Sequence, residues 1–187
     1  MELKGDILMK KLGLIFIFIF MTGLFSGLFF SSNLSYENNE YLSSVLLASF
    51  SDSSAGLVKT FFSALISNLI LILIMAPSIA TKFLSPLPPA MLWFKSFAIG
   101  FCSGLVYLNA EGNAILISAV KILPQNLFLI PAFLIIATML FYGSSSELLK
   151  KNRPRQEKKG LLQLAVISSA LILAGCITEA VCRLIAL

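Results

Sequence analysis

The sequence predicts an all-α integral membrane protein, a five-span helical bundle with a broken fourth helix, a cytoplasmic N-terminus and an outside C-terminus. The 187-residue chain is 58% hydrophobic and only 12% charged, and its mean hydropathy is +0.93, unlike an average soluble domain. Its apolar residues form runs long enough to cross a hydrocarbon core of about 30 Å, which takes roughly 20 residues. We therefore expect one membrane domain, residues 1–187, and no soluble domain of useful size.

The spans follow from the positions of these apolar runs. We predict spans at 12–30, 61–79, 91–108, 115–142 and 161–184. A secretory signal is the alternative for the first run, because Lys10 and Lys11 precede it. The run is longer than the roughly 7–15 residues of a signal core, so we interpret it as an uncleaved span.

The orientation follows from the basic residues, because lysine and arginine in short loops tend to stay cytoplasmic. Three lysines precede the first span, and six lysine and arginine residues occupy the loop at 143–160. The segment at 31–60 contains three acidic residues and one lysine. This distribution predicts that the loop at 143–160 is cytoplasmic and that the segment at 31–60 is outside.

The fourth run contains residues that do not suit a plain lipid-facing helix. The segment ILPQNLFLIPAFLI, 122–135, has Pro124 and Pro131 and the adjacent amides of Gln125 and Asn126. Each proline lacks an N–H and clashes with the preceding turn. The freed backbone groups cost several kcal/mol in hydrocarbon unless protein or a wet cavity satisfies them. We therefore predict a broken helix packed inside the bundle.

The length of this run indicates where the break lies. A straight helix over 115–142 would be about 40 Å long at roughly 1.5 Å per residue, longer than the hydrocarbon core. We place the break near 124–126, in the outer half of the membrane. Lys121 would then reach the outer headgroups or a polar cavity.

Small residues recur at four-residue spacing in three of the spans, a pattern that lets helix backbones approach closely. The ladders are Gly23, Gly27 and Ser31; Ser96, Gly100 and Gly104; and Ala170, Ala174, Thr178 and Cys182. We favour packing within one chain. A dimer face, and hence a homo-oligomer, is the alternative.

Polar residues inside the spans have structural and functional interpretations. A charge at mid-membrane costs roughly 2.5–3.5 kcal/mol on insertion scales, so such residues usually face the protein interior. We expect Glu179 to pair with Arg183 four residues on. Asn68 is interpreted as an interhelical hydrogen-bonding group. Lys95, near the start of its predicted span, is expected to extend to the cytoplasmic surface.

The sequence predicts a protein that is not an enzyme, without catalytic residues, cofactor or metal. It has no histidine, the commonest general base and a common metal ligand. Cys102, Cys176 and Cys182 all fall within spans and are interpreted as packing residues. No phosphate loop occurs. The basic loop at 143–160 is explained by topology and anionic-lipid contact, so we expect membrane lipid and no nucleic acid as a partner.

The segment at 31–60 is the only sizeable surface predicted outside the membrane. An apolar cluster between Val45 and Phe50 favours a short helix there. Such a helix could lie flat at the membrane interface. It could equally bind an extracytoplasmic partner.

Two segments carry a resemblance to a known family. The run Val120–Thr138, VKILPQNLFLIPAFLIIAT, resembles the signature of the stage II sporulation protein M family. The upstream run Lys95–Tyr107, KSFAIGFCSGLVY, is similar to the glycine-bearing span that precedes this signature. Asn68 and Glu179 fall where the broader family tends to carry Asn and Glu.

The resemblance implies a role in sporulation, during engulfment of the forespore by the mother-cell membrane. It implies a non-enzymatic scaffold in that cell membrane that holds an amidase-type peptidoglycan hydrolase and a lytic transglycosylase. We expect the break at 124–126 to shape an outer face on which a partner binds. The alternative is a membrane subunit of a transporter or ABC-type permease, in which Lys121, Gln125, Asn126 and Glu179 line a pathway.

Overall fold

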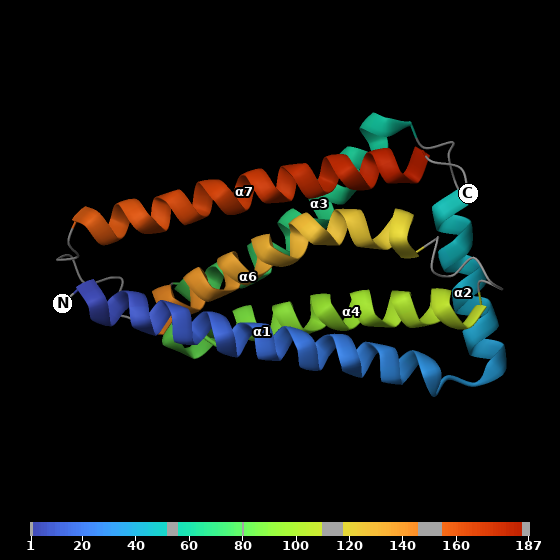
Figure 1. The fold of residues 1–187 in the computed structure, drawn as a ribbon, viewed down its shortest axis with the longest axis horizontal. Coiled ribbons are helices and arrows are strands. Elements are labelled where there is room, and N and C mark those ends of the chain that lie inside the picture. The colour runs from blue at the N-terminus through green and yellow to red at the C-terminus, as the bar shows by residue number, and fades with distance from the viewer. Residues whose placement is uncertain (1, 52–55, 80, 110–117, 146–154, 185–187) are drawn as a thin grey trace.

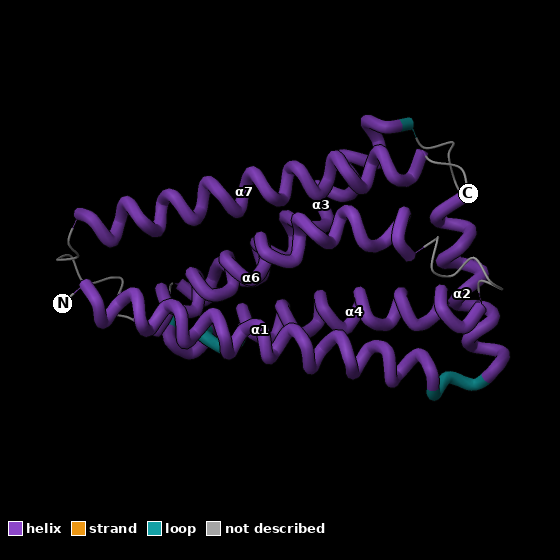
Figure 2. The backbone as a smooth tube through the Cα atoms, in the orientation of Figure 1, coloured by secondary structure: helices purple, strands orange, loops and turns teal. Residues whose placement is uncertain are grey.

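The computed structural model describes residues 2–51, 56–79, 81–109, 118–145 and 155–184, which are helical apart from short connections (Figures 1 and 2). Its helices are α1 (Glu2–Ser32), α2 (Tyr36–Ser51), α3 (Leu57–Met75), α4 (Leu87–Asn109), α6 (Leu123–Ser145) and α7 (Arg155–Leu184). Two 3-10 turns, η1 (Ala76–Ile79) and η2 (Lys82–Leu84), and a π turn, η3 (Ser118–Ile122), complete the order.

Five helices in the described residues are long and apolar enough to cross a membrane, which confirms the predicted five-span bundle. Their spans are Lys11–Ser32, Leu57–Ile79, Leu87–Leu108, Val120–Ser144 and Lys159–Arg183. The long helices run in alternating directions (Figure 1). We call the end where α1 begins the N-terminal end, and the opposite end, which α2 crosses, the α2 end. Residues 146–154 of the predicted basic loop lie outside the described residues.

The core of the bundle is built around α6. One apolar cluster joins α1, α3, α4 and α6 through Phe16, Phe20, Met75, Leu92, Leu129, Phe133 and Ala137. A second joins α3, α6 and α7 through Ala64, Ala132, Ile172 and Cys176. Because α6 contributes to both, it lies between α7 on one side and the α1–α4 pair on the other (Figure 1).

The first two predicted glycine ladders lie against each other between α1 and α4. A Cβ atom at Gly23 would lie 2.6 Å from the Trp93 carbonyl oxygen, and one at Gly27 would lie 2.7 Å from the Phe101 nitrogen. Real Cβ atoms essentially never approach that closely. The backbones of the two helices are therefore in direct contact at these positions.

The same contact continues from the α4 side. A Cβ atom at Gly100 would lie 2.9 Å from the Leu24 carbonyl carbon, and one at Gly104 would overlap the Ser31 hydroxyl. Small residues thus interlock along one seam within the chain, the arrangement that the sequence favours. Close backbone approach compensates for the weak hydrophobic drive between helices in lipid.

The ladder predicted on α7 packs only in part, since Cys182 is buried and Ala174 and Thr178 are half-buried. Ala170 is exposed, whereas Ser168 and Cys176 are buried. The close approach occurs at Gly175, where a Cβ atom would lie 2.7 Å from the Leu129 side chain of α6. Four-residue spacing of small residues identifies a possible face, but the position of the neighbouring helix decides which face is buried.

The fourth span is irregular, as predicted, but not at 124–126. The irregular turn is η3, and regular α6 begins at Leu123 and includes Pro124 as its second residue. The wider π turn accommodates Pro124, whose ring would clash with the Val120 carbonyl in a regular helix. Pro131 lies inside α6 without ending it, and Figure 1 shows that α6 bends along its length, which proline explains.

Candidate functional site

Lys95 of α4 points into the bundle and binds Asn68 of α3. The Lys95 Nζ atom donates a hydrogen bond to the Asn68 Oδ1 atom at 2.9 Å. The expectation that Lys95 extends to the cytoplasmic surface is therefore wrong. An amide on a neighbouring helix lies within reach of the ammonium group, and it compensates for lost hydration inside the span.

Two further helices complete the surroundings of this pair. The Lys95 Nζ atom lies 5.0 Å from the ring centroid of Phe133 on α6, a cation–π distance. Asn68 is only 2% exposed. Its Nδ2 atom donates to the Ala64 carbonyl at 2.9 Å and lies 3.6 Å from the Cys176 sulfur of α7. Residues of α3, α4, α6 and α7 therefore meet at one polar point, which we call the Lys95 cluster (Asn68, Lys95, Phe133 and Cys176).

Glu179 connects the Lys95 cluster to the end of α7. Its carboxylate acts electrostatically on Lys95 and accepts a bond from Arg183 Nη2 at 2.9 Å. The predicted Glu179–Arg183 pair is thus confirmed. The Glu179 side chain is 15% exposed and that of Arg183 is 40% exposed, so the carboxylate lies deeper than its partner.

Lys121 lies at the same end of α7. It is 6% exposed, and its Nζ atom donates to the Arg183 backbone carbonyl at 3.4 Å. A cation near a helix C-terminus is favoured because the last carbonyls of a helix lack intrahelical donors. Lys121 therefore ties the π turn η3 to the C-terminal turn of α7.

The amides of the predicted break face the protein interior. The Asn126 Nδ2 atom donates to the Ile122 carbonyl at 2.8 Å, and Asn126 is buried. The Gln125 Oε1 atom is buried and has no hydrogen-bond partner. Asn126 therefore supports the last residue of the π turn, whereas the side-chain oxygen of Gln125 contributes no hydrogen bond.

The sequence interpretation missed the Lys95 cluster because it placed the start of the third span too late. The predicted start at residue 91 put Lys95 near the membrane boundary, but α4 begins at Leu87. Pro88 and Pro89 lie in its first turn, where a missing N–H is tolerated because those donors have no intrahelical acceptor. A lysine and an asparagine in adjacent apolar runs were the signal that could have indicated their pairing.

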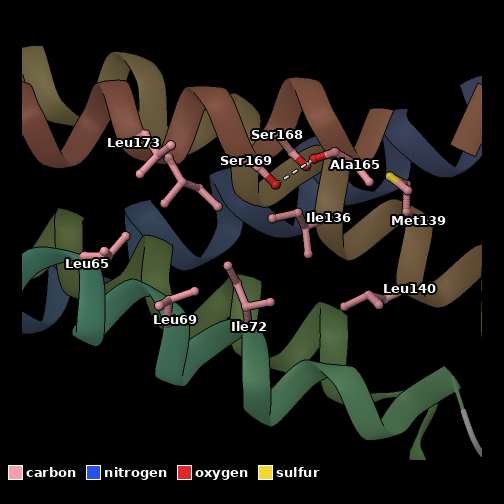
Figure 3. A pocket seen from close by; sticks show the side chains of 11 residues that line it. Leu65, Leu69, Ile72, Ile136, Met139, Leu140, Ala165, Ser168, Ser169 and Leu173 are labelled. Atoms are coloured by element: carbon pink, nitrogen blue, oxygen red, sulfur yellow. Dashed lines mark hydrogen bonds between the residues drawn. The ribbon is translucent and has the colours of Figure 1, made fainter. Parts of the chain in front are cut away.

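An apolar cavity lies between α3, α6 and α7 (Figure 3). Its volume is about 410 Å³. Its lining consists of Leu65, Leu69, Ile72, Ile136, Met139, Leu140, Ala165, Ser168, Ser169, Ile172 and Leu173. We call this space the α3–α7 cavity.

The helix α2 has a packed face and an exposed face. The packed face, buried or half-buried, comprises Asn39, Leu42, Ser43, Leu46 and Leu47. The exposed face comprises Tyr36, Glu37, Glu40, Tyr41, Ser44, Val45 and Ala48. Both sets follow helical spacing of three and four residues. The helix is longer than the predicted cluster from Val45 to Phe50, and it covers the end of the bundle next to α4 (Figure 1).

Within the described part of the chain, no three His, Cys, Asp or Glu residues gather closely enough to hold a metal ion. The described cysteines are free thiols. The site features that the structure brings together are therefore the Lys95 cluster, the ion pair at the end of α7, the α3–α7 cavity and the exposed face of α2.

These features define a multi-pass helical membrane protein with a buried polar cluster in an apolar core. A family model described as Stage II sporulation protein M matches residues 16–182, and the chain belongs to that family. It is thus a sporulation-related membrane protein, as the resemblance in two of its spans predicted. No curated protein and no solved structure matches the chain.

Proposed function

We propose that this protein is a non-enzymatic scaffold of the engulfment machinery in the mother-cell membrane. In this role it holds peptidoglycan-degrading enzymes, an amidase-type hydrolase and a lytic transglycosylase, at the membrane front. The observation that carries the proposal, beyond family membership, is the exposed face of α2. This face is a defined helical surface at one end of a membrane bundle.

The chemistry of the exposed face suits protein binding. Tyr36 is 80% exposed and Tyr41 is 68% exposed, and tyrosine is enriched at binding surfaces because one ring offers both apolar and polar contact. Glu37 and Glu40 add negative charge beside the tyrosines. The surface therefore fits a partner domain with a basic patch and an apolar pocket.

The packed face of α2 supports a scaffold because it fixes the exposed face in position. Ser43 is 4% exposed, and Leu46 and Leu47 are half-buried. A preordered binding surface loses less conformational entropy when a partner binds. Partner binding thus requires no folding of α2.

Charge also supports the side on which α2 acts. Lys159 is exposed near the start of α7, at the N-terminal end (Figure 1), and the sequence of the preceding loop is basic. Under the positive-inside rule that end is cytoplasmic. The α2 end then faces the cell wall, where peptidoglycan-degrading enzymes work.

Co-purification from sporulating cells tests the proposal. The double variant Glu40→Lys/Tyr41→Ala is expected to lower recovery of the hydrolase and the transglycosylase at least tenfold, with normal amounts of the variant in the membrane. The control Tyr107→Ala removes another highly exposed tyrosine, 74% exposed on α4, and is expected to leave recovery unchanged. Equal recovery with wild-type protein and the double variant would refute α2 as the binding surface.

One observation favours a second candidate, a membrane subunit of a transporter or ABC-type permease. Lys95 is a cationic side chain inside a span, and such residues often mark a substrate or ion pathway. Flux measured in reconstituted vesicles separates the two candidates. A flux that is lost in Lys95→Met supports the transporter, whereas unchanged vesicle permeability together with hydrolase co-purification supports the scaffold.

A further inference from the structure

The α3–α7 cavity is large enough to hold a ligand. Its volume of about 410 Å³ lies within the roughly 300–1,000 Å³ typical of small-molecule sites. It also exceeds the roughly 150 Å³ of an apolar cavity that takes up benzene. A space of this size loses much dispersion energy when it is empty, so we expect it to be filled.

The lining selects hydrocarbon over polar ligands. Nine of the eleven lining residues are apolar, and the two exceptions are Ser168 and Ser169. Both hydroxyl groups donate to the Ala165 carbonyl of their own helix, at 2.9 and 2.8 Å (Figure 3). Because each hydroxyl proton is already used, the cavity presents no free donor to a headgroup or a sugar.

The surroundings of the cavity supply an acyl chain. All three helices that form its walls are long and apolar enough to cross a membrane, so the cavity lies at hydrocarbon depth. Leu69 of α3 is 50% exposed and Leu173 of α7 is 46% exposed. Exposed leucines in the lining show that the cavity opens sideways, toward the acyl chains of the surrounding lipid.

Basic residues near the N-terminal end favour a lipid with an anionic headgroup. The helix α7 begins with the sequence RQEKK, so Arg155, Lys158 and Lys159 lie within its first two turns. Ala165 follows Lys159 by six residues, about 9 Å along a helix at roughly 1.5 Å per residue. Basic residues beside a span attract anionic lipid headgroups, and this distance is well within the length of one acyl chain.

We propose that the α3–α7 cavity binds one acyl chain of an anionic phospholipid whose headgroup lies at the basic start of α7. The site is distinct from the exposed face of α2, since no residue of α2 lines the cavity. A variant can therefore lose lipid binding at the cavity and keep partner binding at α2, or the reverse.

Electron paramagnetic resonance of spin-labelled lipids tests the site in the 187-residue chain. The chain is reconstituted in phosphatidylcholine vesicles containing a small amount of spin-labelled phosphatidylglycerol or spin-labelled phosphatidylcholine. We expect the immobilised fraction of phosphatidylglycerol to be several-fold larger than that of phosphatidylcholine. Equal immobilisation of the two lipids by the wild-type protein would overturn the headgroup assignment.

Two matched variants on α7 test the cavity itself. Ala165→Phe places a ring in the cavity and is expected to remove the strongly immobilised phosphatidylglycerol component. Ala170→Phe adds the same side chain at an exposed position on another face of α7 and is expected to retain it. Lys158→Gln/Lys159→Gln is expected to abolish the preference for phosphatidylglycerol while some immobilisation of both lipids persists. An unchanged signal in Ala165→Phe would overturn the proposal.

A crosslinking experiment keeps the proposal testable if Ala165→Phe fails to fold. A photoreactive phenylalanine at Leu173, at the cavity opening, is activated in cell membranes, and the product is weighed by mass spectrometry. An adduct with the mass of a phospholipid supports the proposal. An adduct with a protein would show that a partner helix occupies the cavity, and it would overturn the proposal.

Discussion

The ammonium group of Lys95 lies 2.9 Å from the amide oxygen of Asn68, so a cation on α4 is held by a neutral side chain on α3. The ring of Phe133 and the field of Glu179 also act on this cation. The pair therefore joins two helices inside an apolar bundle without a full charge on the acceptor. Its energetic role is open to direct measurement.

Replacing Asn68 should destabilise the bundle through Lys95. Asn68→Leu removes the acceptor of a buried charged donor, a loss of about 1.5–3 kcal/mol in the free energy of unfolding. The double variant Asn68→Leu/Lys95→Met should recover part of that loss, because it removes the charge as well. Unfolding in mixed detergent micelles measures the free energy of unfolding of the single and double variants. Strict additivity of the two single variants would contradict an energetic link between the residues.

Glycines in α1 should respond to alanine according to what surrounds them. Gly27→Ala is expected to cost about 2 kcal/mol or more, because the new Cβ atom would press on the α4 backbone. Gly13→Ala on the same helix meets nothing within 4 Å and should be neutral or stabilising by about 0.5–1 kcal/mol. Thermal unfolding in detergent compares the two. Equal losses would mean that α1 and α4 do not pack in this way.

Neighbouring amides at the start of α6 should behave oppositely. Asn126→Leu removes the bond to the Ile122 carbonyl and should cost about 1 kcal/mol. Gln125→Leu removes a buried oxygen without a partner and should leave stability unchanged or higher. Hydrolase recovery is measured in parallel. If Gln125→Leu is stable but no longer co-purifies with the hydrolase, the Gln125 amide contributes to partner binding and not to folding.

The ion pair at the end of α7 should be asymmetric. Arg183→Gln is expected to cost less than about 1 kcal/mol, since the arginine is partly exposed and such pairs contribute little. Glu179→Gln should cost more, because this carboxylate also acts on Lys95. The difference should shrink in the Lys95→Met background. The same difference with and without Lys95 would argue against that coupling.

The number and approximate position of the spans could be predicted because hydropathy and length decide them locally. Close packing at Gly23, Gly27, Gly100 and Gly104 could also be predicted from their spacing, although the pairing of α1 with α4 could not. Which residue lies against which depends on helix rotation, and the spacing of small residues alone does not indicate that rotation. Ala170 illustrates this point: it has the right spacing but lies on an exposed face.

The buried position of Lys95 was harder to predict for a physical reason. Pro88 and Pro89 resemble a loop in sequence, yet prolines are tolerated in the first turn of a helix, so Lys95 lies deeper than its position in the apolar run suggests. The break predicted at 124–126 was misplaced for a related reason. Pro124 indicates a disturbed backbone, but the disturbance falls in the turn before the proline, where its ring would clash.

The interlocked seam between α1 and α4 also constrains biosynthesis. The helix α1 ends at Ser32, whereas α4 ends at Asn109, so 77 residues must be added after α1 before its partner is complete. At roughly 5–20 residues per second, translation takes on the order of 4–15 s to supply them. During that interval the surface of α1 at Gly23 and Gly27 is in the membrane without α4. A membrane insertase or chaperone that shields this unpaired surface would act on the nascent intermediate. Substitutions at Gly23 or Gly27 would then affect the yield of assembled protein as well as its final stability.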